Sequence, residues 1–300
     1  MNYTNEVDWH SIATHISQVS GQAFQIQTAY PVTGGCVNEA YRIEGMGKNY
    51  FVKLNKASHL EMFAAEAAGL AELAQPAVIR VPFPQCWGST GEHAYLVMEY
   101  LALRGDTEHS TVALAQQLAV MHQVSKFPFG WYRNNYIGSN LQDNAVESDW
   151  VKFWRRHRLG FQLELAAQNG YTGKLQSLGD ELLQDFGLFF TSYTPYPSLL
   201  HGDLWSGNYG IDIQGQPIIF DPAVYYGDRE VDIAMTELFG GFPAQFYEAY
   251  QECWPLDAGY PTRKVLYNLY HILNHLNLFG GSYLAQSERM IAWLLSELKA

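Results

Sequence analysis

Three polar residues have the spacing expected of a site that holds a metal-bound nucleotide. Asp203 and Asn208 lie five positions apart in the segment HGDLWSGN, and Asp221 follows thirteen positions later, after the apolar run PIIF. The residues between them are typical of a β-hairpin, in which the strand IDI is followed by a turn at 214–216 and by the strand PIIF. A hairpin folds back on itself, so Asn208 and Asp221 are expected to lie side by side. Such a convergence of hard oxygen ligands suits one divalent ion.

The first pair matches the pattern H-x-D-x-x-x-x-N of the protein-kinase catalytic loop. In those enzymes the Asp orients the attacking hydroxyl, the Asn binds Mg²⁺, and a later Asp bridges metal and phosphates. We therefore expect Asp203 to be the catalytic residue, Asn208 and Asp221 to be the metal ligands, and ATP with Mg²⁺ to be the cofactor. The alternative is a loop with an ordinary buried Asp.

A lysine and a glutamate nearer the amino terminus could hold the phosphates. Lys53 lies in the otherwise apolar strand YFVKLN, and Glu66 falls at the margin of the apolar stripe of a helix predicted over 59–74. An inward-facing carboxylate needs a partner, because its burial without one is costly. Lys53 on the preceding strand is the nearest cationic candidate for Glu66. Glu61 and Glu72 are expected on the solvent face of the helix. The alternative for Lys53 is an edge-strand position without a functional partner.

Two further segments are candidates for nucleotide contacts. Gly34 and Gly35 lie between predicted strands, where a backbone without side chains could approach phosphates closely and direct N–H groups at them. A plain tight turn is the alternative. In the segment LVMEYL, the backbone at Glu99, Tyr100 and Leu101 would face adenine if this segment connects two lobes. An ordinary core strand is the alternative.

The composition limits the possible functions. A length of 300 residues, 48% of them hydrophobic, allows two lobes around a cleft. A formal charge of −12 without a basic stripe argues against nucleic acid as a partner. No run of 18 apolar residues is present and the amino terminus lacks the apolar core of a secretory signal, so no membrane association is expected. Three widely spaced cysteines suit a reducing cytoplasm.

The order of the predicted elements indicates the fold class. Strands are predicted over 24–31, 39–44, 48–54 and 93–101, and helical patterns dominate from 107 onward apart from 201–221. Strands first and helices later predict an α+β chain of two lobes. We expect a small antiparallel-sheet lobe with one main helix over 1–101 and a larger, mostly helical lobe over 102–300.

The whole chain resembles the fructosamine kinase, or ketosamine 3-kinase, family, a branch of the protein-kinase-like fold related to aminoglycoside and choline kinases. The resemblance rests on TGGCVNEAYRI, FAAEAAGLAEL, WYRNNYIGSNLQDN, HGDLWSGN and YNLYHILNHLNLFGGSYL. Members phosphorylate the 3-hydroxyl of sugars attached to amines through an Amadori linkage, and the product then breaks down to free the amine. The resemblance implies a bilobal kinase fold in which Asp203 positions the sugar hydroxyl, and in which Lys53 with Glu66 holds the nucleotide phosphates.

The acceptor residues are expected in two places. Trp205, inside the catalytic loop, could form an apolar wall for the sugar and an attractive surface for the substrate's ammonium. Core packing is the alternative. The resemblance places the uncharged helix YHILNHLNLFGG near the acceptor, so Asn274 and His275 are expected to bind the substrate. A satisfied core histidine is the alternative for His275, and a metal pair of His271 with His275 would lack an acidic third ligand.

Other residues are expected to support or regulate the site. Asp232 should brace the catalytic loop through backbone N–H groups, and the cluster Arg155, Arg156 and Arg158 should form a solvated helix face, with an acceptor contact by one arginine as the alternative. Gly202 replaces the arginine that responds to a phosphorylated activation loop in regulated protein kinases, which predicts constitutive activity.

Cys36 follows the double glycine, where N–H groups that attract anions would favour the thiolate. The resemblance implies redox sensitivity at this cysteine, so we expect a monomer or a redox-dependent homodimer. A small loop residue without a role is the alternative.

Two other functions stay open at this point. One is a kinase for another small alcohol, such as an aminoglycoside, choline or a sugar. The other is a catalytically silent nucleotide-binding regulator, which would be expected to lack one of Lys53, Asp203, Asn208 or Asp221, and all four are present. The sugar of the ketosamine and its carrier, a small molecule or a protein, are not given by residue types.

Overall fold

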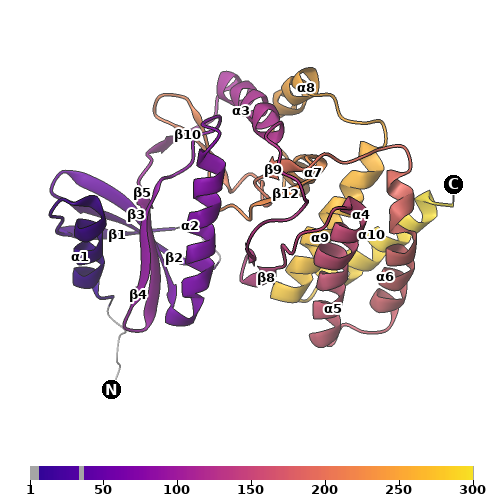
Figure 1. Cartoon of the computed structure of the whole chain (residues 1–300), viewed down its shortest axis with the longest axis horizontal. Coiled ribbons are helices and arrows are strands. Elements are labelled where there is room, and N and C mark those ends of the chain that lie inside the picture. Colours follow the sequence, from indigo (N-terminus) through magenta and orange to yellow (C-terminus); the bar gives the residue numbers. More distant parts are fainter. Residues whose placement is uncertain (1–6, 34–36, 300) are drawn as a thin grey trace.

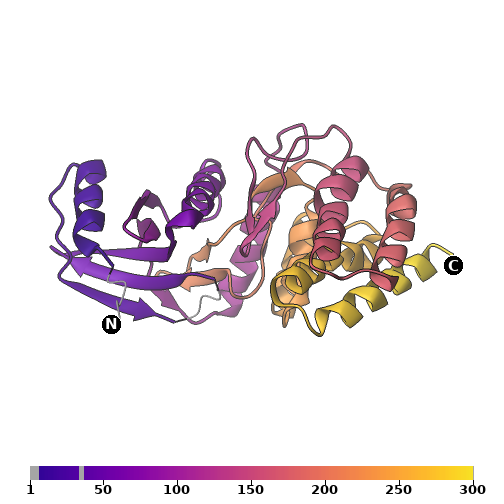
Figure 2. The same ribbon diagram turned by 90° about the horizontal axis from the view of Figure 1, so that it is seen from below.

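The computed structural model describes residues 7–33 and 37–299 and has two parts of different architecture. An antiparallel sheet with helices α1 and α2 forms one end of the molecule, and a mostly helical part forms the other (Figure 1). Figure 2 shows the same division from below. The expected α+β architecture is confirmed, while the exact boundary after residue 101 stays a prediction.

The sheet at the first end has five strands in the order β1-β2-β3-β5-β4, all paired antiparallel. Their bounds are β1 Thr28–Val32, β2 Glu39–Gly45, β3 Lys48–Lys56, β4 Pro84–Thr90 and β5 His93–Glu99. Strand β4 was not predicted, because it carries Pro and Gly and lies at the edge of the sheet, where both are tolerated. In the central strand β3, Val52 and Leu54 are buried toward α1 (Trp9–Ser20), so the alternate residue Lys53 faces the other side.

Helix α2 (Leu60–Ala74) packs between this sheet and the second part of the molecule. The expectation that Glu72 faces solvent is wrong: the residue is 8% exposed, and its carboxylate accepts hydrogen bonds from Tyr226 Oη at 2.8 Å and Trp131 Nε1 at 3.3 Å. A single apolar stripe suggested one buried face, but α2 is covered on two sides. Glu61 is exposed as expected.

The second part contains eight helices of the α type among the described residues, together with short strands. The helices are α3 Glu108–His122, α4 Trp150–Trp154, α5 Phe161–Gln168, α6 Lys174–Asp185, α7 Glu230–Leu238, α8 Ala244–Cys253, α9 Tyr260–Phe279 and α10 Tyr283–Glu297. A π-helical segment, Arg155–Gly160, connects α4 to α5 without a break. The strands are β6 Leu103–Arg104, β7 Asn135–Ile137, β8 Asn140–Gln142, β9 Ser198–Leu200, β10 Tyr209–Asp212, β11 Pro217–Ile219 and β12 Tyr225–Gly227, and single 3₁₀ turns lie at Ala57–His59 and Phe186–Phe190.

Helix α9 is the central helix of the second part and explains the long uncharged run of the sequence. It contacts α5, α7 and α10, and most of its residues are buried. Asn274, His275 and Asn277 are accommodated there because they form hydrogen bonds within the protein, whereas the buried ring of His271 does not. Over the described residues, no helix is both long and apolar enough to cross a membrane.

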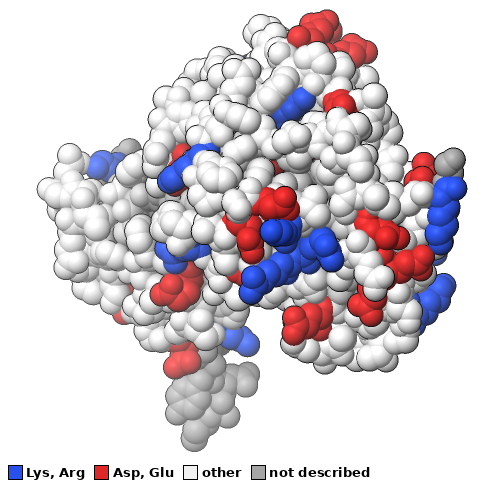
Figure 3. Space-filling view, turned by 45° about the vertical axis from the view of Figure 1, so that its right-hand side comes forward, with Lys and Arg blue, Asp and Glu red and all other residues white. Residues whose placement is uncertain are grey.

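The arginine cluster divides between surface and core. Arg155 and Arg156 are exposed, as expected of a solvated face. Arg158 is fully buried: it donates to Asn144 Oδ1 at 2.7 Å, and its guanidinium lies 4.0 Å from the ring centroid of Tyr225. The expectation is wrong for this residue, because three arginines within four positions cannot all point the same way from one helix. On the face drawn in Figure 3, basic side chains form a compact group beside acidic ones rather than a continuous stripe.

Candidate active site

Lys53 is the centre of an ion cluster that joins strand β3 to the following helix α2 and to Asp221, which lies 168 positions later in the chain. Its Nζ atom lies 2.6 Å from Glu66 Oε1 on α2 and 2.6 Å from Asp221 Oδ1, which follows β11. Burial alone would lower the pKa of Lys53, but the charges of Asp221 and Glu66 outweigh this effect and raise the pKa. The expected pair of Lys53 with Glu66 is present, and Lys53 remains a cation at any physiological pH.

The hairpin β10–β11 brings the predicted metal ligands together. Asn208 precedes β10 and Asp221 lies two residues after β11, and Asn208 Nδ2 is 3.5 Å from the backbone oxygen of Asp221. The same nitrogen donates to the backbone oxygen of Asp203 at 2.8 Å and to its Oδ2 at 3.2 Å. Asp221 has a φ of 57°, a left-handed conformation that Asp tolerates better than most residues. The three residues therefore share one site, as the spacing predicted.

The Asp203 carboxylate lies where ionisation is disfavoured. Its side chain is 23% exposed and lines a cavity. Burial in the first place, and then the charge of Asp221, raise its pKa to about 7. A carboxylate with such a pKa is suited to accept a proton near neutral pH.

Asp232 on α7 holds the catalytic loop. Its Oδ2 accepts from the backbone N–H of His201 at 2.7 Å and its Oδ1 from that of Gly202 at 2.8 Å, with His122 Nε2 at 3.2 Å. Burial would raise the pKa of Asp232, but the hydrogen bond and charge of His122 lower it overall. The brace expected at Asp232 is therefore present.

Gly202 occupies a position that excludes any side chain. Its φ is 83°, and a Cβ atom added there would lie 2.1 Å from the backbone oxygen of Ala223. An arginine of the kind found in regulated protein kinases cannot be accommodated in this backbone conformation. The steric result agrees with the prediction of constitutive activity, which itself stays a prediction.

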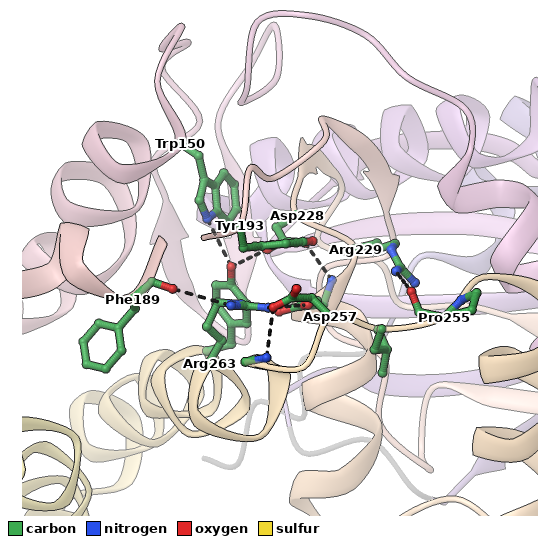
Figure 4. A network of polar contacts seen from close by, with 12 residues as sticks. Trp150, Phe189, Tyr193, Asp228, Arg229, Pro255, Asp257 and Arg263 are labelled. Carbon is green, nitrogen blue, oxygen red and sulfur yellow. Dashed lines mark hydrogen bonds and ion pairs between the residues drawn. The ribbon is translucent and has the colours of Figure 1, made fainter. Parts of the chain in front are cut away.

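A buried polar network continues from α7 toward α9 (Figure 4). Asp228, just before α7, accepts from Tyr193 Oη at 2.9 Å and Tyr267 Oη at 2.5 Å. Arg263 donates two hydrogen bonds to the Glu230 carboxylate, from Nε to Oε2 at 2.7 Å and from Nη2 to Oε1 at 2.9 Å. Because Tyr267 and Arg263 lie on α9, the network joins the helix that braces the catalytic loop to the helix that carries His275. The acid-rich segment DREVD was the only sequence signal for it.

One cavity of about 880 Å³ is lined by every predicted site residue that the structure describes. These residues are Lys53, Glu66, Glu99, Tyr100, Leu101, Asp203, Trp205, Asn208, Asp221, Asn274 and His275. Gly34, Gly35 and Cys36 lie outside the described residues, so their contacts stay predictions. The cavity runs from the sheet to α9, and Asp203 and Asp221 lie between its two ends.

The end beside the sheet is mainly apolar. Phe51, Ile218 and Phe220 line it together with the segment that contains Glu99 and Tyr100. The carboxylate of Glu99 accepts from Arg80 Nη2 at 2.5 Å, so its side chain is already engaged. The backbone N–H of Glu99 donates to the backbone oxygen of Phe83 at 2.9 Å, so this group is engaged as well. A mainly apolar lining with a few polar groups is typical of small-molecule sites.

The end beside α9 is an aromatic enclosure around His275. Its ring centroid lies 4.9 Å from that of Phe239, 5.4 Å from Phe279 and 5.3 Å from Tyr283, and Phe239 lies 6.3 Å from Trp205. His275 Nδ1 is 2.7 Å from the backbone oxygen of His271, so Nδ1 is the donor and Nε2 the acceptor. Burial lowers the pKa of His275 and keeps it neutral. The three rings other than Trp205 were missed, because aromatic residues near helix ends carry no distinctive pattern.

Asn274 lines the cavity, but its amide is engaged within the protein. Its Oδ1 accepts from Asn140 Nδ2 at 2.9 Å and Gln162 Nε2 at 3.2 Å, and its Nδ2 donates to the backbone oxygen of Ile137 at 3.3 Å. These contacts attach the β7–β8 hairpin to α9. A direct substrate contact by Asn274 stays a prediction.

The donor atoms fit magnesium held jointly with phosphates. In the described part of the chain, no group of three or more His, Cys, Asp or Glu residues could hold a metal ion alone. Asp221 and Asn208 offer two hard oxygen donors beside Lys53. Magnesium characteristically takes one or two protein oxygens and completes its shell with phosphates and water.

Comparisons with known proteins agree with this site. A model of the family described as fructosamine kinase matches residues 8–297. The chain is 46% identical over 301 aligned positions to a Synechocystis protein named "Probable ketoamine kinase", with 97% of this chain and 98% of that protein covered.

Solved structures extend the similarity to the fold. A crystal structure of a protein described as a fructosamine-3-kinase, from Haemophilus somnus 129PT, has a TM-score of 0.87 at 31% identity and covers 96% of this chain and 97% of its own. A thermostable mutant of aminoglycoside phosphotransferase has a TM-score of 0.60 at 16% identity, with 96% and 97% covered, which shows a common fold alone. The expected protein-kinase-like fold is confirmed.

Proposed function

Because the chain belongs to the fructosamine kinase family, we propose that it transfers the γ-phosphoryl group of ATP to the 3-hydroxyl of a ketosamine. One observation carries the proposal. A single cavity of about 880 Å³ connects the Lys53 ion cluster, through Asp203, to the aromatic enclosure around His275. Phosphoryl transfer requires this continuity between donor and acceptor ends, because the two reacting oxygens must lie in line with phosphorus.

The nucleotide end would hold the donor through placed charges. When bound, ATP supplies the phosphoryl group and Mg²⁺ neutralises the charge that develops on it. Lys53, oriented by Glu66, would bind the phosphates, and Asn208 and Asp221 would provide the metal ligands. The backbone at Glu99, Tyr100 and Leu101 would face the base. Lys53 is already oriented by two carboxylates, so little reorganisation is needed during the reaction.

Asp203 would act on the acceptor hydroxyl. Its Oδ2 contacts Asn208, whereas its Oδ1 has no hydrogen-bond partner among the described residues. A sugar hydroxyl can therefore donate to this carboxylate, which orients the oxygen and takes its proton as the new O–P bond forms. Positioning and charge stabilisation would supply most of the rate.

The acceptor end favours a substrate with a sugar and a cationic amine. Among the described lining residues, the α9 side of the cavity contains no charged side chain apart from Asp203. Rings of Trp205, Phe239 and Tyr283 offer faces to sugar C–H groups and to a secondary ammonium. A pocket for an acceptor that carries several anionic groups would require cations, which this end lacks.

Acceptor profiling tests the proposal against its alternatives. ATP consumption and product mass would be measured with ribulosamine, erythrulosamine and fructosamine derivatives of one amine, and with choline, an aminoglycoside and free sugars. We expect phosphorylation of a ketosamine to exceed that of the other alcohols. Transfer only to another alcohol would favour the first alternative, and no transfer to any of them would favour a silent nucleotide-binding regulator.

Gly207 offers a specific test of the indole wall. A Cβ atom added at Gly207 would lie 2.4 Å from both Cζ2 and Cη2 of Trp205, so Gly207→Ala must displace the indole. We expect the KM for the ketosamine to rise several-fold, roughly 1 kcal/mol of lost contact, with the KM for ATP unchanged. Ser206→Ala, in the same loop but exposed, is the matched control. Equal changes in both KM values for Gly207→Ala would contradict the assignment of Trp205 to the acceptor.

Other expectations stay predictions beside this proposal. They include a cytoplasmic location, the absence of nucleic-acid and membrane partners, and a monomeric or redox-dependent dimeric state through Cys36. The cheapest of these to test is the last. If Cys36→Ser leaves the activity as sensitive to peroxide as before, the redox role fails.

A further inference from the structure

His271 on α9 is a buried histidine whose ring is not satisfied. The residue is 1% exposed, and neither Nδ1 nor Nε2 has a hydrogen-bond partner among the described residues. An unpaired polar atom in the protein interior costs on the order of 1–3 kcal/mol, and most buried polar atoms avoid that cost. An apolar residue of the same size would fill this space without it. The ring packs edge-on against Tyr270, with 5.2 Å between the centroids, a contact that an apolar ring could also make, so the two nitrogens have no evident role in stability.

The unpaired ring faces the catalytic carboxylate. His271 Nδ1 lies 4.0 Å from Asp203 Oδ1, the oxygen that has no partner of its own, while Oδ2 of the same carboxylate is 3.2 Å from Asn208 Nδ2. A separation of 4.0 Å exceeds a hydrogen bond by about 1 Å. A movement of about 1 Å that brings the two side chains together would form the bond. Catalytic hydrogen bonds are often this long before substrate binds and shorten in the complex.

The chemistry of the two groups sets the direction of the bond. Burial in the first place, and then the neighbouring His275, lower the pKa of His271 to about 3, so the ring is neutral and carries one N–H. A carboxylate oxygen can only accept, so the proton must be on Nδ1 for the two groups to bond. Among the described residues, no hydrogen-bond partner competes for either ring nitrogen.

We propose that His271 is a positioning residue for Asp203: its Nδ1–H donates to Asp203 Oδ1 when the acceptor is bound. The carboxylate is then held at one oxygen by His271 and at the other by Asn208, and its remaining lone pairs are directed at the sugar hydroxyl. His271 suits this role because helix α9 fixes its backbone and the buried ring cannot turn toward water. The identity of the acceptor rests on the proposed function, whereas the arrangement of His271 and Asp203 does not depend on it.

Three substitutions test which ring atom matters. In His271→Asn the amide nitrogen can occupy the place of Nδ1, in His271→Gln it can occupy that of Nε2, and His271→Phe keeps the ring without nitrogen. We expect His271→Phe and His271→Gln to lower kcat on the order of 10- to 100-fold, the cost of a misplaced catalytic group. His271→Asn should remain within about threefold of wild type, and the KM for ATP should change little in all three variants.

Thermal unfolding separates positioning from a structural role. Because His271→Phe removes two unsatisfied buried atoms, we expect its melting temperature to equal or exceed that of wild type while kcat falls. A histidine needed only for packing would show the reverse pattern. If the Phe variant does not fold, the comparison of Asn with Gln, which are both polar, still decides between the two ring nitrogens.

Three results would overturn the proposed role of His271. A wild-type kcat in His271→Phe, or an Asn variant no more active than the Gln and Phe variants, overturns the proposal. In the Asp203→Asn background, His271→Phe should cause no further loss of residual activity, and a loss as large as in wild type would also overturn it. All variants are assayed on whichever alcohol the wild-type protein phosphorylates, so rejection of ketosamines would refute the proposed substrate and leave this test in place.

Discussion

Replacement of Asp203 by Asn is expected to lower turnover by about a hundredfold or more while ATP still binds. The amide keeps the size of the side chain and the contact with Asn208, but it cannot take the proton of the acceptor hydroxyl. Lys53, Glu66 and Asp221 remain in place because none of their bonds involves the Asp203 side chain. The measurement is single-turnover phosphorylation of a ketosamine together with calorimetric titration of an ATP analogue.

Unchanged turnover in this variant would refute the catalytic assignment, and loss of nucleotide binding would show that the substitution acts on the donor end instead. Ser206→Asn, which introduces the same residue at an exposed position of the same loop, is the control for non-specific effects.

The same substitution should also stabilise the protein in the absence of metal and nucleotide. The pKa of Asp203 is about 7 in the fold, against 3.8 for an ordinary Asp, so the folded state binds this proton more tightly than the unfolded state. Asp203 therefore does not lower the free energy of unfolding below about pH 4, where it is protonated in both states. As the pH rises toward 7 and above, ionisation of Asp203 lowers that free energy. The advantage of Asp203→Asn should grow over this range to an upper limit of about 4 kcal/mol. Chemical unfolding in EDTA at pH 5 and pH 8 measures it, and equal differences at both pH values would contradict the raised pKa.

Replacement of Asp232 by Ala is expected to have the largest effect on stability. It leaves the N–H groups of His201 and Gly202 and the ring of His122 without their buried acceptor. Removal of one partner from a buried charged network costs about 3–5 kcal/mol. Because both N–H groups belong to the catalytic loop, turnover should fall in molecules that remain folded. Urea unfolding and activity at 20 °C measure the two effects.

Asp257 provides the matched control for Asp232. It also lies in the polar network, where it accepts from Arg263 Nη2 at 2.7 Å, but its side chain is 32% exposed. Asp257→Ala should cost within about 1 kcal/mol, as expected for a partly solvated ion pair. Equal losses in the two variants would show that Asp232 has no special part in the catalytic loop.

Much of the phosphate-transfer site could be predicted from local patterns. The spacing of Asp203, Asn208 and Asp221 and the intervening hairpin were sufficient to bring these residues together, because a hairpin is closed by its own residues. The pair of Lys53 with Glu66 followed from one strand and the next helix, where the position of a carboxylate on the apolar stripe required a cation. These inferences depend only on periodicity and short separations along the chain.

The positions of Glu72, Arg158 and His271 could not be predicted in this way. Glu72 is buried because the second part of the protein covers the far side of α2, and Arg158 is buried because the Tyr225 ring of β12 packs against its guanidinium. His271 meets Asp203 only where α9 passes the catalytic loop, 68 positions later in the chain. A residue pattern reports which face of an element is apolar, but it carries no information on what packs against the other faces. The catalytic and metal-binding residues of this protein can therefore be predicted from short segments of the sequence. The shape of its acceptor end arises from contacts between segments far apart, because burial and the choice of partners depend on packing in three dimensions.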